Sequence, residues 1–291
     1  MTKSVASMLT SYDSAAARET AQRLRELWLK ADKVDMASIS QEQRELQEIA
    51  GIGVPALKEI GDAVAKEAGK KVDEYLPLAG TLWDEFGREG RVVAAILLGS
   101  LALAEPAKVL PVLQEMAGTC VTWEDADRLA MDGAEPVVRQ KPQAWLGTLE
   151  PWLVDKNKWV RRAGITVIGR LPMKYPELTR RTLDLAERLL RDEDPDVRRA
   201  VSFAIRMSAR GEVPAVVGFL ARHVPPTEPS GNWVLCDVIC SMSKQSLPSF
   251  AGMLTRYERW AKDPQLSPQD KSSVDSAVQV LREAARKRGR A

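Results

Sequence analysis

The sequence has few of the residues that build sheets and most metal centres. Aromatic residues make up 5% of the 291 residues, and there are one histidine and three cysteines. Alternating apolar and polar runs, which indicate half-buried strands, are missing, whereas alanine, leucine, glutamate and arginine are abundant. The composition, 45% hydrophobic and 28% charged, is ordinary for a globular protein. We therefore expect an all-α fold.

The scarcity of histidine and cysteine excludes the common zinc sites. Cys120, Cys236 and Cys240 are an odd number with no C-x-x-C spacing, and the single His223 cannot complete a zinc site with them. We interpret the cysteines as buried thiols in a reducing compartment. His223 lies beside a proline-containing loop, where a surface role is favoured over a catalytic one. We expect neither a metal nor a cofactor.

Long apolar runs and catalytic signature motifs are also missing. No stretch approaches the roughly 18 apolar residues of a membrane span, and the N-terminus lacks the apolar core of a secretory signal. We therefore expect a cytoplasmic protein. There is no phosphate-binding glycine loop, no G-x-S-x-G and no H-E-x-x-H. These absences are not evidence against an enzyme whose chemistry needs only a carboxylate.

A repeat of 36 or 37 residues underlies the middle of the chain. Helices are predicted to start at Trp123, Trp159, Asp196 and Trp233, with a weaker copy near 86–91. Each unit combines a helix rich in alanine and valine, a break containing glycine or proline, and a second helix. Such pairs cannot bury their apolar faces alone, so they have to stack on their neighbours. We predict a HEAT-like α-solenoid of stacked antiparallel helix pairs with a concave basic face.

The predicted organisation is a single solenoid domain over residues 1–280, and we expect a monomer. N-terminal helices occupy 1–48, the repeats about 50–240, and C-terminal helices 241–280. Residues 281–291 are strongly basic and short, so we expect a tail that does not fold.

The charge is uneven along the chain, although the total is only +2. The segment from Lys156 to Arg210 has 14 Lys or Arg and 7 Asp or Glu, which leaves −5 for the remainder. On a helical projection of 196–210, one face is small and apolar and the other has three arginines around a phenylalanine, with no acid. The apolar face consists of Val197, Ala200, Val201, Ala204 and Ser208. The outward residues are Arg199, Phe203, Arg206 and Arg210, and the preceding copy places Arg162, Thr166 and Gly169 outward.

Two interpretations of this outward face stay open. The simpler one is a solvated cationic surface. The other is a surface for a polyanion, where the arginines contact phosphates and the ring of Phe203 contacts a base or sugar. Neutralised phosphates supply most non-specific DNA affinity, so the uneven charge suggests that one face meets phosphate.

One further pair has the spacing of a reactive site. Trp123 and Asp127 are four residues apart in a predicted helix and therefore share a face. If the helix registers of successive repeats align, this face lies near Arg162 and Phe203. The alternative is that Trp123 packs between repeats and Asp127 is a solvated acid, and spacing alone favours that alternative.

At these residues the chain resembles the AlkD-type DNA alkylation repair family, whose members are built of HEAT-like repeats. The matching pieces occur in the family's order and at similar separations over roughly residues 50–210. They are Gly53-Val54-Pro55 with Leu57; Leu82-Trp83 followed by Glu89, Arg91, Ala94 and Ala95; Trp123 with Asp127; Trp159-Val160-Arg161-Arg162-Ala163; and Val197-Arg198-Arg199-Ala200 with Arg206. No single piece is specific, but the ordered set is.

The resemblance implies a substrate and a set of site residues. Members of the family wrap duplex DNA in their concave face and excise cationic N3- and N7-alkylated purines. The family's aromatic–Asp pair corresponds to Trp123 and Asp127, and its concave arginine to Arg162. Where the family has a second lesion-facing tryptophan, this chain has Phe203, which is smaller and lacks an N–H. The other expected DNA contacts are Thr166, Arg199, Arg206 and Arg210.

Excision of a cationic purine needs few catalytic groups. An N-alkylated purine is positively charged and is therefore a good leaving group that needs no strong general acid. A carboxylate such as Asp127 stabilises the oxocarbenium character that grows on the sugar and orients the attacking water. Aromatic faces at Trp123 and Phe203 add cation–π or stacking contacts of roughly 0.5–2 kcal/mol each. We expect monofunctional hydrolysis of the N-glycosidic bond; a non-catalytic DNA-structure binder and a protein-interaction scaffold are the alternatives.

Overall fold

The computed structural model describes residues 2–10, 12–228 and 231–288. Their elements are helical, apart from one isolated antiparallel bridge between Lys33 and Ile52. The predicted all-α fold is confirmed. No helix in this part of the chain is long and apolar enough to cross a membrane.

The chain divides into two compact units, unit 1 over Met1–Trp145 and unit 2 over Leu146–Ala291. Unit 1 contains α1 (Thr2–Leu9), α2 (Ala17–Trp28), α3 (Gln41–Leu46), α4 (Val54–Ala68), α5 (Val72–Glu85), α6 (Gly87–Ala104), α7 (Pro106–Ala117), α8 (Trp123–Arg128), a π-helical segment (Leu129–Ala134) and α9 (Glu135–Gln140). The division falls within α10 (Pro142–Leu149). Unit 2 contains α11 (Lys158–Arg170), α12 (Thr179–Glu187), α13 (Pro195–Ser208), α14 (Val213–His223), α15 (Asn232–Cys240), α16 (Leu254–Trp260) and α17 (Pro268–Arg288).

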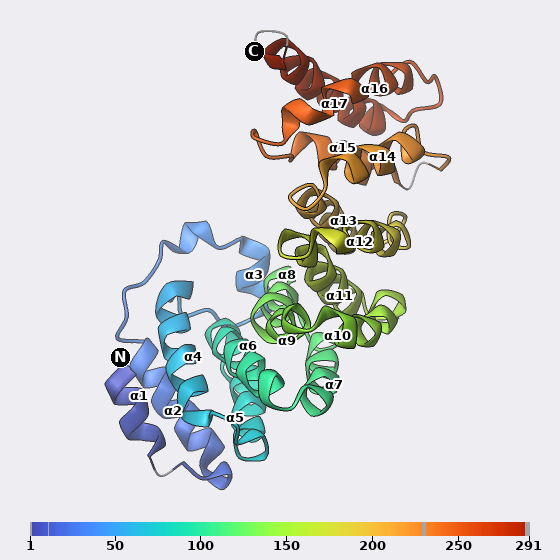
Figure 1. The fold of residues 1–291 in the computed structure, drawn as a ribbon. Coiled ribbons are helices and arrows are strands. Elements are labelled where there is room, and N and C mark those ends of the chain that lie inside the picture. The colour runs from blue at the N-terminus through green and yellow to red at the C-terminus, as the bar shows by residue number, and fades with distance from the viewer. Residues whose placement is uncertain (1, 11, 229–230, 289–291) are drawn as a thin grey trace. The chain divides into compact units, whose positions relative to one another are not determined.

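Unit 1 is organised around α6. Thirteen of the 18 residues of this helix are buried, because α4, α5, α7 and the π-helical segment all pack on it. A helix covered on several sides is apolar nearly all round, which explains the uninterrupted apolar run from Val92 to Leu98. The helices α1 and α2 extend this packing onto α4 and α5 (Figure 1).

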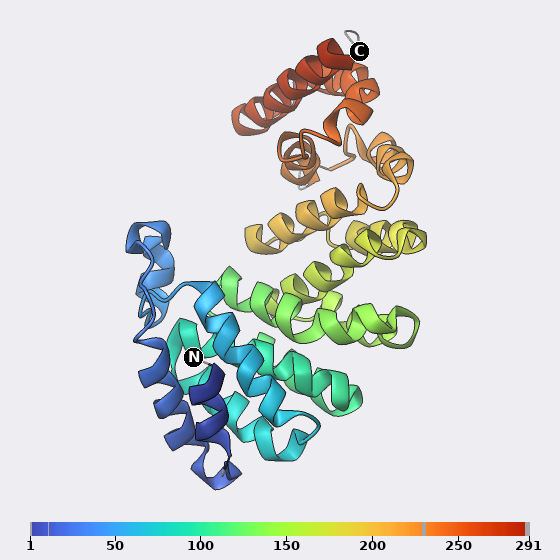
Figure 2. The same ribbon diagram turned by 60° about the vertical axis from the view of Figure 1, so that its left-hand side comes forward.

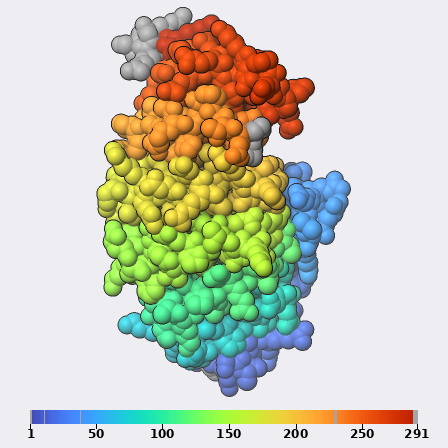
Figure 3. Space-filling view, turned by 90° about the vertical axis from the view of Figure 1, so that its right-hand side faces the viewer, coloured from blue at the N-terminus to red at the C-terminus, as the bar shows by residue number. Residues whose placement is uncertain are grey.

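Unit 2 repeats one arrangement in chain order. The helices α11, α13, α15 and α17 are successive neighbours, while α12 and α14 pack on α13 and α16 packs on α17 (Figure 2). Within this unit the space-filling view shows successive stretches of the chain as bands, coloured from green to red (Figure 3). The predicted architecture of stacked helix pairs is confirmed. That unit 1 and unit 2 form a single domain stays a prediction.

The predicted helix starts are confirmed to within one residue. The helices α8, α11, α13 and α15 begin at Trp123, Lys158, Pro195 and Asn232. Side-chain caps fix three of these starts, because the first backbone N–H groups of a helix have no partner within it. Thr122 forms a capping box with Asp125, Asn157 accepts a hydrogen bond from the N–H of Trp159 at 2.8 Å, and Asp194 accepts one from Asp196 at 2.8 Å.

Two further predictions, on the C-terminal residues and on the burial of the cysteines, are wrong. Residues 281–288 are not an unfolded tail but the end of α17, because Leu281 and Ala284 are buried and continue its apolar face. Residues 289–291 lie outside the described part of the chain. Cys120 and Cys236 are buried as expected, but Cys240 is exposed at the end of α15.

Gly99 marks a close approach between α6 and the π-helical segment. A Cβ at this position would lie 2.0 Å from the carbonyl oxygen of Asp132, whereas a Cβ at Gly80 of α5 would meet no atom within 4 Å. Gly99→Ala should therefore lower the free energy of unfolding by about 1–3 kcal/mol, as other overpacked sites do. Gly80→Ala, the matched control, should raise it by about 0.5–1 kcal/mol through its better helix propensity. Urea denaturation measures both, and a Gly99→Ala protein as stable as wild type would contradict the close contact.

Candidate nucleic-acid interface

The short helix α8 exposes an aromatic ring and buries two carboxylates. Trp123 is 44% exposed, and Asp127, one turn further on, is half-buried. Glu124 and Asp125 are buried. Because successive helical residues are about 100° apart, Asp125 points away from the face that Trp123 and Asp127 share, and Glu124 lies on a flank of the helix.

Glu124 is held by a buried ion pair with Arg88 of α6. Arg88 donates from Nε and Nη2 to the two carboxylate oxygens at 2.9 and 2.8 Å, and from Nη1 to the carbonyl of Ile52 at 3.1 Å. Burial acts to lower the pKa of Arg88, but the Glu124 and Glu89 carboxylates outweigh it and the pKa is raised. The guanidinium therefore stays charged although its side chain is only 8% exposed.

Glu89, the other carboxylate beside Arg88, holds the chain before α4. It accepts hydrogen bonds from the backbone N–H groups of Ala50, Gly51 and Ile52 at 3.0, 3.1 and 3.2 Å. Gly51 has a φ of +80°, a conformation that favours glycine. The segment before α4 is thus fixed on α6 by backbone hydrogen bonds to one buried side chain.

Asp125 is held by a second, largely buried ion pair. Arg91 of α6 donates from Nη1 to Oδ2 of Asp125 at 2.6 Å, and the N–H groups of Val121 and Thr122 donate to the same oxygen at 3.1 and 3.0 Å. The Arg91 guanidinium lies 4.9 Å from the centre of the Trp83 ring. Two neighbouring residues of α8 are therefore tied to α6, while Trp123 stays exposed.

In unit 2, the first arginine of each Arg-Arg pair clamps a loop. Arg161 donates from Nη1 to the carbonyls of Asp155 and Lys156 at 2.9 and 3.1 Å. Arg198, 37 residues later, makes the same contacts with Asp192 and Glu193 at 3.0 and 3.0 Å. A further hydrogen bond to Asp192 raises the pKa of Arg161. These two arginines stabilise the loops that precede α11 and α13.

The expectation that Arg162, Thr166 and Gly169 face outward is wrong. Arg162 and Thr166 are only 7% and 3% exposed, and Arg162 donates from Nη1 to the carbonyl of Asp196 at 2.6 Å. A Cβ at Gly169 would lie 2.5 Å from the Cβ of Ala204. The reason is that α13 packs directly along this flank of α11. Thr166 therefore offers almost no surface to a phosphate.

The outward face of α13 has its predicted residues. The Arg199 side chain is 61% exposed and pairs with Asp196 at 3.0 Å, and Arg210 is exposed just beyond the end of the helix. Phe203 and Arg206 are half-buried, with the guanidinium carbon 5.9 Å from the ring centre. Burial lowers the pKa of Arg206, and Asp237 opposes that effect. The opposite face of Val197, Ala200, Val201, Ala204 and Ser208 is buried as predicted.

The predicted site residues lie in both units. Unit 1 contains Trp123 and Asp127, one turn apart on α8. Unit 2 contains Arg162, Thr166, Arg199, Phe203, Arg206 and Arg210 on α11 and around α13. That the two groups share one face, and their roles toward DNA, stay predictions. Arg88, Glu89, Glu124 and Asp125 were not singled out as a unit, although the spacing of Thr122 and Asp125 is that of a capping box.

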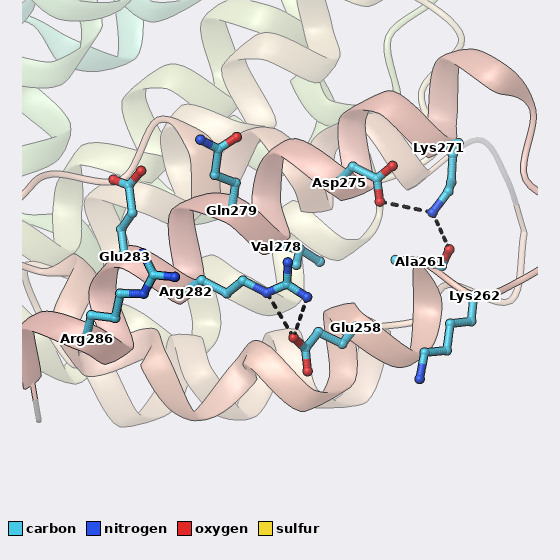
Figure 4. A pocket seen from close by; sticks show the side chains of 10 residues that line it. All are labelled: Glu258, Ala261, Lys262, Lys271, Asp275, Val278, Gln279, Arg282, Glu283 and Arg286. Atoms are coloured by element: carbon cyan, nitrogen blue, oxygen red, sulfur yellow. Dashed lines mark hydrogen bonds and ion pairs between the residues drawn. The ribbon is translucent and has the colours of Figure 1, made fainter.

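A polar groove lies elsewhere, between α16 and α17. It has a volume of about 680 Å³ and contains none of the predicted site residues (Figure 4). Arg282 pairs with Glu258 at 2.8 Å, and Lys271 pairs with Asp275 at 3.0 Å. Because these opposite charges neutralise each other, the groove has no strong preference for an anion. The described residues include no group of three or more His, Cys, Asp or Glu side chains arranged to bind a metal ion.

Comparisons with known proteins give a family and a shared fold. The model of a family described as DNA alkylation repair enzyme matches residues 20–230. AlkD2 from Streptococcus mutans is 15% identical, with a TM-score of 0.61 over 78% of this chain and 99% of its own. The protein smu.31 from Streptococcus mutans UA159 is 18% identical, with a TM-score of 0.50 over 65% of this chain and 98% of its own. No curated protein matches the chain.

The Arg88–Glu124 pair should contribute far more to stability than an exposed pair. Arg88→Met leaves the Glu124 carboxylate buried without its cation, which typically costs about 3–5 kcal/mol. Lys58→Met, the matched control, breaks the Lys58–Asp62 pair, whose side chains are 57% and 58% exposed, and should cost at most about 1 kcal/mol. Urea denaturation measures both free energies of unfolding. Equal losses would show that the buried pair does not hold α8.

Proposed function

Because the chain belongs to the family of DNA alkylation repair enzymes, we propose that it is a monofunctional DNA glycosylase acting on duplex DNA. It excises N3- and N7-alkylated purines by hydrolysis of the N-glycosidic bond. The observation that carries this proposal is the face of α8, where an exposed indole and a carboxylate lie one turn apart on a helix held by two buried ion pairs. The chemistry needs neither a metal nor a cofactor.

Asp127 is the proposed catalytic residue. The alkylated purine leaves as a neutral base, so the positive charge that has to be stabilised develops on the sugar. A carboxylate lowers the energy of that charge most when it does not have to reorient during the reaction. The ion pairs of Glu124 and Asp125 meet this requirement, because they fix the backbone of α8 at the two residues that precede Ala126 and Asp127. Asp127 also orients the water that attacks the sugar.

Aromatic rings and exposed arginines complete the proposed contacts. Trp123 stacks on the alkylated nucleotide, and Phe203 takes the position where the family has a second lesion-facing ring. The arginines that contact phosphate are Arg199 and Arg210, whose side chains are exposed. Such contacts follow the DNA backbone without reading base sequence, and they make affinity depend on salt.

Charge reversal should separate a DNA-binding surface from a merely solvated one. The double variant Arg199→Glu/Arg210→Glu should weaken binding to a random duplex by about tenfold or more, and should reduce the slope of log K against log salt by about 2. Arg180→Glu is the matched control, since Arg180 of α12 is 79% exposed. Fluorescence anisotropy at several salt concentrations measures the affinities. Equal effects of both reversals, or no binding at low salt, would favour a protein-interaction scaffold.

Removing the Asp127 carboxylate should abolish most of the activity while leaving DNA affinity unchanged. Asp127→Asn should slow excision about a hundredfold, because one preorganised group that stabilises the transition state is lost. Asp84→Asn, at an exposed position of α5, is the control and should excise at the wild-type rate. The assay uses a duplex with one 7-methylguanine, followed by alkali to cut at abasic sites.

Phe203→Trp decides between an impaired enzyme and a non-catalytic binder. It restores the ring of the family and should raise the excision rate if the smaller ring limits it. If wild type and Phe203→Trp both bind the duplex tightly yet leave the strand intact, the glycosylase proposal fails. A non-catalytic binder of DNA structure then takes its place.

A further inference from the structure

The six-residue helix α3 lies beside α8 (Figure 1). A helix of this length is not stable alone in water, so tertiary contacts have to hold it in place. Its start is fixed by a capping box in which Ser40 and Gln43 bond each other. The chain after it is fixed by the hydrogen bonds from residues 50–52 to Glu89. The contacts at both ends of α3 therefore hold it against the buried side of α8.

Two glutamines of this region contact the two buried carboxylates of α8. Gln43 is buried and donates from Nε2 to Oε2 of Glu124 at 3.1 Å. Gln47, at the C-cap of α3, donates from Nε2 to Oδ1 of Asp125 at 3.3 Å. Each carboxylate thus receives an arginine from α6 and a glutamine from the α3 side.

The glutamines add constraints that the arginines alone do not supply. Arg91 and two backbone N–H groups all donate to Oδ2 of Asp125, whereas Gln47 donates to Oδ1. A carboxylate held at both oxygens cannot pivot about one of them. Because Asp125 lies two residues before Asp127 in the same short helix, the orientation of its carboxylate constrains the rotation of α8.

If stability were the only role of Gln47, its amide would be less favourable at this position than a fully paired group. Within the described part of the chain, its Oε1 atom is buried and has no hydrogen-bond partner. A buried acceptor without a partner costs free energy, which offsets part of what the hydrogen bond from Nε2 to the buried Asp125 carboxylate contributes. The benefit of the amide is the hydrogen bond from its Nε2 to the Asp125 carboxylate.

We propose that Gln43 and Gln47 are positioning residues, through which α3 clamps α8 and sets the placement of Trp123 and Asp127 against bound DNA. This inference rests on the proposed function. It assigns a role in the reaction to α3, which contains none of the site residues expected from the sequence. The clamp acts through Glu124 and Asp125 and does not touch the substrate.

The test compares three Gln→Met variants, which keep side-chain length and remove the amide. Gln43→Met and Gln47→Met remove the two clamp contacts, and Gln41→Met is the matched control on an exposed position of the same helix. Three quantities are measured for each: the single-turnover rate of 7-methylguanine excision, the Kd for the same duplex, and the Tm. We expect Gln47→Met to excise about tenfold more slowly, since small misplacements of a catalytic group have effects of this size or larger. Its Kd should stay unchanged, and its Tm should change little because the lost hydrogen bond and the removed unpaired acceptor oppose each other, while Gln41→Met behaves as wild type.

The possible outcomes separate the inference from the proposed function. If wild type excises and both clamp variants excise at the wild-type rate, the inference is overturned and the proposed function stands. The inference is also overturned if the clamp variants lose Tm but excise normally per folded molecule, because that is a structural role. If wild type excises nothing, the proposed function fails first and the inference falls with it. A slower rate at unchanged Kd and Tm supports the clamp.

Discussion

The structure of unit 1 depends on two buried ion pairs, Arg88–Glu124 and Arg91–Asp125, that tie α8 to α6. Largely buried charges are tolerated when their hydrogen-bonding positions are satisfied, and this network thereby fixes α8 on α6. The same helix therefore has a rigid, polar, buried side and a side that exposes Trp123. We propose that this division preorganises the Asp127 carboxylate, which would let so small a set of residues stabilise the charge that develops on the sugar.

Unit 2 shows how one sequence pattern acquires different uses in successive repeats. Arg161 and Arg198 both clamp the loop before their own helix, so this use is local and repeats with the sequence. The next arginines differ, because Arg162 is buried against Asp196 of α13 while Arg199 is exposed. What separates them is the neighbouring helix, since α13 packs closely along α11 where Gly169 meets Ala204. A large share of the positive charge in this segment thus stabilises the repeats themselves.

Sequence patterns predicted what is local and missed what depends on distant partners. The all-α fold, the helix starts and the buried stripe of α13 follow from caps and periodicity within a few residues. The network around α8 joins residues 36 and 81 positions apart, so no local pattern indicates it. The burial of Thr166 depends on α13, and the end of α17 folds because two apolar residues among basic ones reach a neighbouring surface.

The central claim is that this chain hydrolyses the N-glycosidic bond of a cationic purine with the Asp127 carboxylate. The most direct measurement is mass spectrometry of the products formed from a duplex that contains a single 7-methylguanine. We expect wild type to yield free 7-methylguanine and an unbroken strand with one abasic site in equal amounts, and Asp127→Asn to yield almost none of either in the same time. A duplex that is bound by wild type but recovered chemically unchanged would contradict the claim.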